Sequence, residues 1–415
     1  MAALTVLLAQ NMRYLPSHGG ANRSNRILLE ALAARGHRCV AVTPLHATEH
    51  RLTVEDLLAD LAGRGVSDAR QTGDTVVYTF RGVTVHAVTA PSRLAAQVLA
   101  VAAAERPDRT LVPSDDPGLL MLGTALRATP GRVVYLVHTL QQLPFGPRAF
   151  YPNDSGLRLV RRAAGVVAVS GAARDYVRAY GELDPTLIHP PVYGPGPWPA
   201  STGDAVTMVN PCGFKGLPVL LGLADACPQV PFLAVPTWGT TAGDRADLAR
   251  RPNITIVPPA DDLAAVYARS RALLMPSLWD ETFGYTAVEA MLHGVPVLAA
   301  DVGGLGEAKL GVPYLLPVTP IRRYLPQRPD APYPEPELPP QDLGPWLAAL
   351  WRLLTDPAHH AAVAAAGRAA AGAFTGGLDP GTFERYLTDL PVGEPEPVDQ
   401  ARRRALAALL ARRPR

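Results

Sequence analysis

Glu281 and Glu289 stand with seven residues between them, directly after an apolar run at 272–275. The run predicts a buried strand, and the residues that follow predict a helix that begins near Phe283 and holds Glu289 about one turn inside. The N-terminus of a helix offers free backbone N–H groups and a positive dipole end to a phosphate. Carboxylates beside a phosphate repel it, but they accept hydrogen bonds from sugar hydroxyls. A nucleotide sugar has a sugar at each end of its diphosphate, so this spacing predicts a nucleotide-sugar site.

Three other features follow predicted strands, at the edge where open α/β sheets bind ligands. Gly19 and Gly20 let the backbone approach a ligand closely. His138 ends a buried strand. Lys215 is one of only two lysines in a chain whose basic residues are otherwise arginine, and its charge would attract a phosphate. Taken singly, a glycine pair is also typical of a turn and a lone histidine of a satisfied core residue.

The segment 276–307, PSLWDETFGYTAVEAMLHGVPVLAADVGGLGE, resembles the E-x7-E region of retaining glycosyltransferases of family four, which have the GT-B fold. The glycine pair resembles the family's segment near the donor diphosphate, and Lys215-Gly216 resembles its phosphate-binding K-G. The HTL at 138–140 resembles that of enzymes that glycosylate inositol phosphate. The resemblance covers both halves of the chain in the right order, and it implies an α/β protein with two Rossmann-like doubly wound domains facing a cleft.

The resemblance also assigns roles to individual positions. It implies catalytic roles for His138 and Glu281. The donor-binding residues that it implies are Gly19, Gly20, Asn210, Lys215, Phe283, Gly284, Tyr285 and Glu289. The loop 141–153 is expected to shape the pocket for the second substrate, and the candidates to bind that substrate are Asn22, Phe145 and Tyr151.

Two positions depart from the family pattern. Asn210 stands where the family has an arginine that binds the diphosphate, and Asn22 stands where it has a glutamate. A lost guanidinium removes a bidentate donor to phosphate, so another arginine must replace it or the donor must be held differently. The candidates for replacement are Arg13, Arg23 and Arg26. Asp115 and Asp116 follow another predicted strand, where they either face the cleft or cap a turn.

Apolar runs alternate with helical patterns along the chain, which predicts parallel sheets. The predicted elements include a hairpin of strands 76–80 and 83–88, a strand at 295–298 and an amphipathic helix at 400–412. The Pro/Gly-rich stretch 190–198 cannot continue a helix or a central strand, so we place a hinge there. The predicted parts are an N-terminal domain 1–190 that binds the second substrate, a nucleotide-sugar-binding domain 199–390 and a helical tail 391–415. Residues 317–340 contain nine prolines and predict a surface excursion without secondary structure.

Composition narrows the partners. Of 415 residues, 48% are hydrophobic and 18% charged, with a net charge of +2, which disfavours nucleic acid as the main partner. We expect no signal peptide and no stable membrane insertion, because no apolar run is long enough. Three isolated cysteines favour a reducing, cytoplasmic location. A homodimer stays open.

The sequence therefore predicts transfer of a sugar from a UDP or GDP sugar to a soluble small molecule, with retention implied by the family resemblance. No metal and no cofactor besides the donor substrate are expected, because no D-x-D motif follows a strand. The arginine-rich composition favours bacterial natural-product or low-molecular-weight thiol biosynthesis. Two alternatives stay open at this point: a nucleotide-sugar epimerase or hydrolase, and a nucleotide-sugar-binding homologue without activity.

Overall fold

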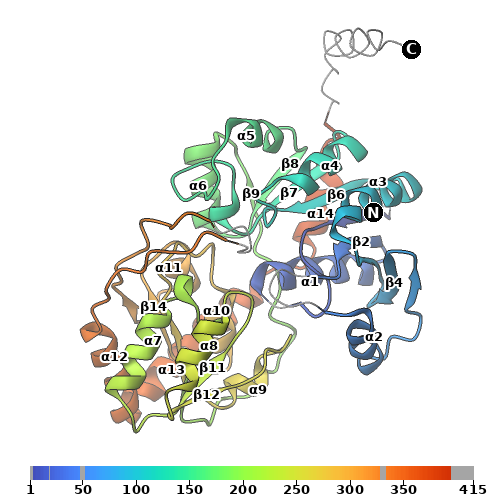
Figure 1. The fold of residues 1–415 in the computed structure, drawn as a ribbon. Coiled ribbons are helices and arrows are strands. Elements are labelled where there is room, and N and C mark those ends of the chain that lie inside the picture. The colour runs from blue at the N-terminus through green and yellow to red at the C-terminus, as the bar shows by residue number, and fades with distance from the viewer. Residues whose placement is uncertain (1–2, 18, 47–51, 328–332, 394–415) are drawn as a thin grey trace, which may run out of the picture.

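The computed structural model describes residues 3–17, 19–46, 52–327 and 333–393, which form two α/β domains that face one another (Figure 1). The first domain is built on a nine-stranded sheet with the order β3-β4-β5-β2-β1-β6-β7-β8-β9. All neighbours from β5 to β9 pair in parallel, whereas β3, β4 and β5 are antiparallel at one edge. The strands are β1 (Thr5–Ala9), β2 (Arg38–Pro44), β3 (Arg70–Thr72), β4 (Thr75–Phe80), β5 (Val83–Val88), β6 (Arg109–Pro113), β7 (Val133–Val137), β8 (Gly165–Ala168) and β9 (Thr186–Leu187).

The second domain is built on a six-stranded, all-parallel sheet with the order β12-β11-β10-β13-β14-β15. Chain order reverses between β10 and β13, as it does between β1 and β6 in the first sheet. Ligands of doubly wound sheets bind beside such reversal points, beyond the carboxyl ends of the strands. The strands are β10 (Ala205–Val209), β11 (Phe232–Val235), β12 (Ile254–Ile256), β13 (Ser270–Met275), β14 (Val297–Ala300) and β15 (Leu315–Leu316).

Helices cover both faces of each sheet, as parallel sheets require. In the first half of the chain they are α1 (Gly20–Ala34), α2 (Val54–Gly63), α3 (Leu94–Glu105), α4 (Leu120–Ala128), α5 (Asp154–Val160) and α6 (Gly171–Gly181). In the second half they are α7 (Leu217–Ala226), α8 (Ala242–Ala249), α9 (Ala264–Tyr267), α10 (Tyr285–Leu292), α11 (Leu305–Ala308), α12 (Gly344–Thr355), α13 (Pro357–Gly376) and α14 (Thr382–Asp389). No helix of the described chain combines the length and the apolar character that a bilayer crossing requires.

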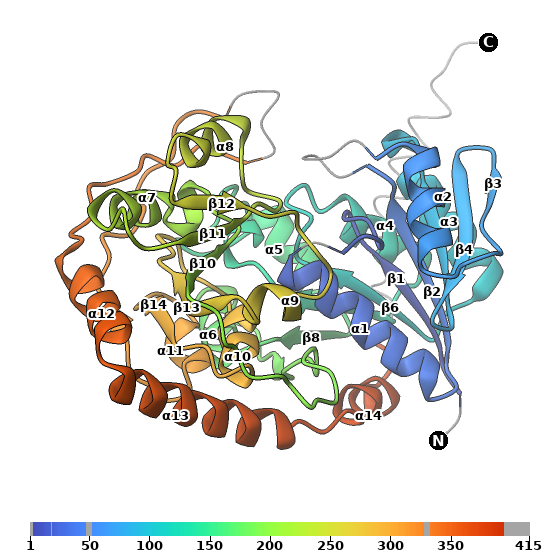
Figure 2. The same ribbon diagram turned by 90° about the horizontal axis from the view of Figure 1, so that it is seen from below.

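The chain crosses back to the first domain at its end. Figure 2 shows α13 running along the second domain and leading to α14, which lies beside the first. Phe383 and Leu387 of α14 are buried in the first domain's core, and Glu384 forms an ion pair with Arg35 and a hydrogen bond with His37 Nε2 at 2.9 Å. The predicted range 199–390 therefore places α14 with the wrong core, because a short amphipathic helix carries no signal that says which sheet it will cover.

Alternation along the strands fills the two faces of the first sheet. Val6 and Leu8 of β1 face one apolar cluster, while Leu7 and Ala9 face the other. A third, larger cluster surrounds the second sheet. The two domains therefore have separate cores, and they meet at loops beyond the carboxyl ends of the strands and at α1, whose Ile27 packs against the second domain's cluster.

Most predicted elements are confirmed, including the hairpin of β4 and β5. Two differences have local causes. The strand predicted at 295–298 is found two residues later, because Pro296 has no N–H and Val295 N donates to Ala290 O at the end of α10. The prolines of 317–340 do not prevent a hairpin-like excursion, in which Tyr324 bridges Pro336. The helix predicted at 400–412 lies outside the described residues.

Candidate functional site

One pocket lies between the two domains, at the carboxyl ends of both sheets. Loops after β1, β6 and β7 form its first-domain side, and loops after β10, β11 and β13 form the opposite side. Most of the predicted site residues line it: Gly19, Gly20, Asn22, His138, Asn210, Lys215, Glu281, Phe283, Gly284, Tyr285 and Glu289. The sequence thus assembled a set of positions that are scattered along the chain but adjacent in the fold.

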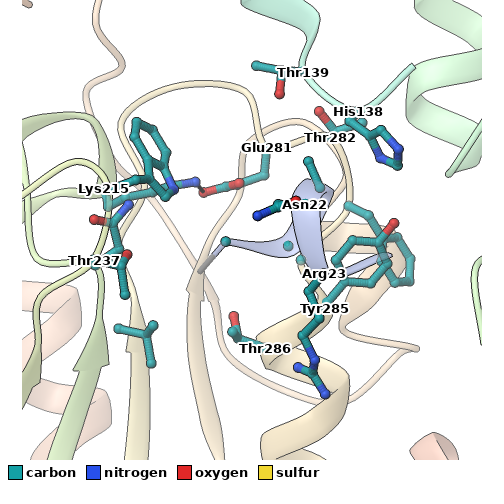
Figure 3. Close-up of a pocket in the computed structure, with 18 of the residues that line it drawn as sticks. Asn22, Arg23, His138, Thr139, Lys215, Thr237, Glu281, Thr282, Tyr285 and Thr286 are labelled. Carbon is teal, nitrogen blue, oxygen red and sulfur yellow. Dashed lines mark hydrogen bonds and ion pairs between the residues drawn. The ribbon is translucent and has the colours of Figure 1, made fainter. Parts of the chain in front are cut away.

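Glu281 and Lys215 are ion-paired in the pocket, with Nζ and Oε1 2.6 Å apart, and Figure 3 shows the two side chains pointing toward one another. Ser277 donates a hydrogen bond to the same carboxylate oxygen. Lys215 Nζ also lies 4.7 Å from the centroid of the Trp279 ring, within the range of a cation–π interaction. These contacts hold the one pocket lysine where an incoming anion can reach it.

The backbone of the Glu281 loop is fixed by the turn at 303–304. Gly304 N donates to Glu281 O at 2.7 Å, and Gly303 has a positive φ of 52°. A Cβ at Gly303 would lie 2.3 Å from Glu281 O, and a Cβ at Gly304 would lie 2.3 Å from Thr282 O. Both glycines are therefore required by the close approach of two backbones.

Glu289 is buried in α10 and held from two sides. Arg23 of the first domain forms an ion pair with Oε1, and Tyr267 O–H donates to Oε2 at 3.1 Å. Arg23 also donates to Val192 O in the hinge at 3.2 Å. The carboxylate that the resemblance assigns to a sugar therefore also joins the two domains.

Asn210 ends β10 in the left-handed region, with φ 57°, where asparagine is tolerated better than most residues. Its Oδ1 accepts a hydrogen bond from Gly239 N at 2.9 Å, so the side chain anchors the loop after β11. Its Nδ2 is buried and has no partner. Asn210 therefore presents a neutral donor to the pocket where the family has a charged one.

Of the three arginines considered as replacements, Arg23 lines the pocket. Arg26 pairs with Glu30 at 2.9 Å and is buried on α1. Arg13 is also buried and does not line the pocket. Arg23 is therefore the candidate that can reach a ligand, although Glu289 holds it in this structure.

The first turn of α10 closes the same side of the pocket. Gly284, with φ 126°, precedes the helix, and no side chain caps its N-terminus. Across the cleft, a Cβ at Gly20 would meet the Tyr285 ring at 2.8 Å, and one at Gly19 would meet Trp238 at 3.2 Å. The glycine pair therefore lets the first domain approach Tyr285 and Trp238 closely, while the predicted approach to a ligand stays a prediction.

His138 is buried at the end of β7 and belongs to a chain of hydrogen bonds. Its Nε2 lies 2.7 Å from Asn25 Oδ1, Asn25 Nδ2 donates to Gln10 Oε1, and Gln10 Nε2 donates to Asn22 Oδ1. Burial lowers the pKa of His138 to about 3, so the ring is neutral. Because Asn25 Oδ1 requires a proton on Nε2, Nδ1 is a free acceptor, and it has no partner.

Asp115 faces the pocket, whereas Asp116 caps α4. Asp116 Oδ2 accepts from Met121 N at 2.7 Å. Asp115 Oδ1 accepts from Thr139 Oγ1 at 2.7 Å, while Oδ2 is buried without a partner. Burial raises the pKa of Asp115 to about 6. The sequence left open whether each aspartate faces the cleft or caps a turn, because an aspartate directly after a strand is typical of both.

Two glutamines complete this side of the pocket. Gln141 Nε2 donates to Asp280 O at 3.0 Å, and the Oε1 atoms of Gln141 and Gln142 are buried without partners. We call Asp115, His138, Gln141 and Gln142 the first-domain wall. The sequence missed the two glutamines, although the loop 141–153 that begins with them was singled out.

Two of the residues predicted to bind the second substrate lie elsewhere in the structure. Phe145 is buried in the first domain's core against Gly181, so it cannot contact a ligand as expected. Tyr151 is 38% exposed and lies outside the pocket lining. Trp238 and Tyr333 line the pocket instead, with ring centroids 5.6 Å apart. Tyr333 comes from the proline-rich excursion, which gave no sign of reaching a site.

Comparison with known families agrees with this architecture. Residues 18–193 match the model described as Glycosyltransferase Family 4, and residues 225–318 match that described as Glycosyl transferases group 1. With the two facing domains and the pocket between them, these matches identify the chain as a GT-B glycosyltransferase of the family four type.

Curated relatives match only a short part of the chain. The D-inositol 3-phosphate glycosyltransferase of Rhodococcus erythropolis is 49% identical over 57 residues, which is 13% of each protein. That of Mycobacterium sp. strain KMS is 37% identical over 91 residues, 21% of this chain and 20% of the relative. The match therefore spans much less than two thirds of these relatives, and their substrate is a statement about them.

Solved structures share the whole fold. Anabaena HepE in complex with UDP-glucose aligns with a TM-score of 0.63 at 18% identity, covering 93% of this chain and 98% of the other. The catalytic domain of starch synthase IV from Arabidopsis thaliana, bound to ADP and acarbose, aligns with a TM-score of 0.59 at 13% identity, covering 94% and 99%.

Proposed function

We propose that this protein transfers a sugar from a nucleoside diphosphate sugar to a small-molecule hydroxyl or amine. The observation that carries the proposal is the chemistry of the second-domain wall, which we define as Asn210, Lys215, Trp279 and the first turn of α10. The buried groups of this wall without partners can all donate: they are Asn210 Nδ2, Trp279 Nε1 and the Tyr285 hydroxyl, and α10 has no side-chain cap. Donors beside a cation fit a diphosphate.

The glutamates fit the two sugars of such a donor. Glu281, near Lys215, would accept hydrogen bonds from the hydroxyls of the transferred sugar, and Glu289 would accept those of the ribose. Both carboxylates are ion-paired in the structure, so the ligand must exchange these pairs for its own contacts. The pairs keep two carboxylates from facing a diphosphate as uncompensated charges.

The proposed reaction follows from the same groups. The bond between the anomeric carbon and the diphosphate oxygen breaks, and the nucleophile of the second substrate bonds to that carbon on the same face. Its proton passes to the departing phosphate oxygen, whose charge Lys215 and the α10 amides stabilise. The neutral His138 would accept a hydrogen bond beside the reacting carbon through Nδ1. Retention rests on the resemblance to family four.

We also propose that the reaction needs neither a divalent metal nor a further cofactor, because the second-domain wall itself supplies the charge that faces the diphosphate. The UDP and ADP complexes of the structural neighbours support a nucleotide in this cleft. Transfer in the presence and absence of EDTA at equal rates is the expected result, and a rate restored only by Mg²⁺ would contradict it.

The first experiment measures thermal stabilisation and calorimetric binding with UDP, GDP, ADP and TDP. We expect one of them to stabilise the protein clearly, and the same nucleotide to stabilise Glu281→Ala as well. Transfer is then assayed with sugars of that nucleotide. Release of free sugar without any second substrate would indicate a hydrolase, and no response to any nucleotide would contradict the proposal.

A further inference from the structure

The first-domain wall presents hydrogen-bond acceptors to the pocket. Its buried atoms without partners are Asp115 Oδ2, His138 Nδ1, Gln141 Oε1 and Gln142 Oε1, and each of them is an acceptor. Unpaired buried polar atoms are costly, so a ligand that pairs with them must bring donors. Ordinary hydroxyl and protonated amino groups donate, whereas a phosphate dianion offers acceptors alone.

Neighbouring groups fix the orientations of three of these four side chains, those of Asp115, His138 and Gln141. Thr139 Oγ1 holds the other oxygen of Asp115 at 2.7 Å. Gln141 Nε2 donates a hydrogen bond to Asp280 O at 3.0 Å, which turns Gln141 Oε1 toward the pocket. Asn25 holds Nε2 of His138 and leaves Nδ1 free. At these three side chains the exposed acceptor is thus a property of the surrounding hydrogen bonds.

The charges of the pocket separate Asp115 from the other carboxylates. Lys215 pairs with Glu281, Arg23 with Glu289, Arg64 with Asp261 and Arg148 with Asp280. In the described part of the chain Asp115 has no ion pair, and its partner is the Thr139 hydroxyl. Lys215 and Arg23, the two cations among the described residues that line the pocket, are each ion-paired with a carboxylate.

Resting on the proposed function, we propose that the second substrate is a polyol or amino polyol that carries no phosphate. Its O–H or N–H groups bind the first-domain wall, and an amino group is best placed at Asp115. A phosphorylated substrate would bring negative charge to an unpaired carboxylate while the donor diphosphate already occupies Lys215. In this respect the protein would differ from the relatives named for inositol 3-phosphate.

The test pairs substrates that differ by one phosphate. With a sugar of the nucleotide that binds, the protein is offered myo-inositol and D-inositol 3-phosphate, glucose and glucose 6-phosphate, and the amines glucosamine and 2-deoxystreptamine. Products are quantified by mass spectrometry. We expect at least about tenfold more product from unphosphorylated members.

Equal or faster transfer to a phosphorylated member would overturn the proposal. So would the absence of product from every unphosphorylated member while nucleotide binding is intact. Loss of nucleotide binding itself would instead contradict the proposed function, so the two failures are distinguishable.

The variant Asp115→Asn tests the cause of the selectivity. We expect it to raise the KM of the preferred substrate about tenfold and to shrink the preference over the phosphorylated twin, with unchanged nucleotide affinity. The matched control is Asp116→Asn in the same loop, whose neutral oxygen can still cap α4 and which does not line the pocket. A preference that survives Asp115→Asn, or falls equally in the control, would overturn the assignment to Asp115.

Discussion

The two walls of the pocket share their architecture but have opposite hydrogen-bonding character. Both are made of loops beyond the carboxyl ends of parallel strands, next to a reversal of strand order. The second-domain wall offers free donors and a lysine, whereas the first-domain wall offers free acceptors and an unpaired aspartate. The doubly wound fold thus fixes where ligands bind, while a few loop side chains decide which charge each half accepts.

The largest expected effect concerns the carboxylate that lies on the donor side. Glu281→Ala removes the partner of the transferred sugar's hydroxyls and leaves Lys215 without its ion pair, so the transfer rate should fall about 1000-fold. Steady-state rates with saturating donor measure this, and nucleotide affinity should fall little or rise. A variant that keeps a tenth of the rate would remove Glu281 from the reaction.

Lys215→Met should weaken nucleotide binding at the second-domain wall and leave the first-domain wall unchanged. Loss of a charged hydrogen bond to the diphosphate should reduce nucleotide affinity by about 10- to 100-fold, while the methionine keeps the contact with Trp279. Calorimetry with the preferred nucleoside diphosphate measures the change. Comparison with the free nucleoside provides the control, because its affinity should not depend on Lys215. Equal losses for both ligands would indicate a disordered site.

A fall in pH should weaken binding of the second substrate at the first-domain wall. The pKa of Asp115 is raised to about 6 by burial, so this carboxylate gains a proton as the pH falls through that value and loses its charge. We expect kcat/KM for the second substrate to fall below pH 6 and to level off about tenfold lower, at the loss expected for Asp115→Asn. The pH profile of Asp115→Asn should lack this limb. An unchanged acid limb in the variant would assign it to another group.

The smallest effect concerns stability. Because the folded pKa of Asp115 lies above its ordinary value of 3.8, the folded state binds the proton more tightly, and the charged form is disfavoured at neutral pH. Asp115→Asn should therefore raise the free energy of unfolding at pH 7.5 by about 1 to 3 kcal/mol, and the gain should vanish toward pH 4. Urea unfolding at both pH values measures it, and a gain that persists unchanged at pH 4 would contradict its assignment to the charge of Asp115.

The two lysines of the chain, Lys215 and Lys309, differ in location and environment. The rarity of lysine in this sequence singles out both as candidate functional residues. Lys215 lies in the pocket, as the family pattern implied. Lys309 is fully buried, donates to Val297 O, and has its pKa lowered to about 7 by burial. Rarity alone does not distinguish the pocket lysine from the buried one. The K-G motif does, because it places Lys215 just beyond the end of a strand.

Most of the strands, the order of the motifs and many of the positions that line the pocket follow from the sequence alone. Local periodicity and the E-x7-E spacing carry that information, since both depend on residues that are near in the chain. The aspartates after β6, the glutamines after β7 and Tyr333 were decided only by the tertiary structure. Asp116 accepts a hydrogen bond from a backbone amide of α4, whereas Asp115 contacts Thr139 and faces the pocket. Which aspartate takes which position depends on packing between distant segments. The hydrogen-bonding character of each wall is likewise set by partners far away in the chain, which no local pattern records.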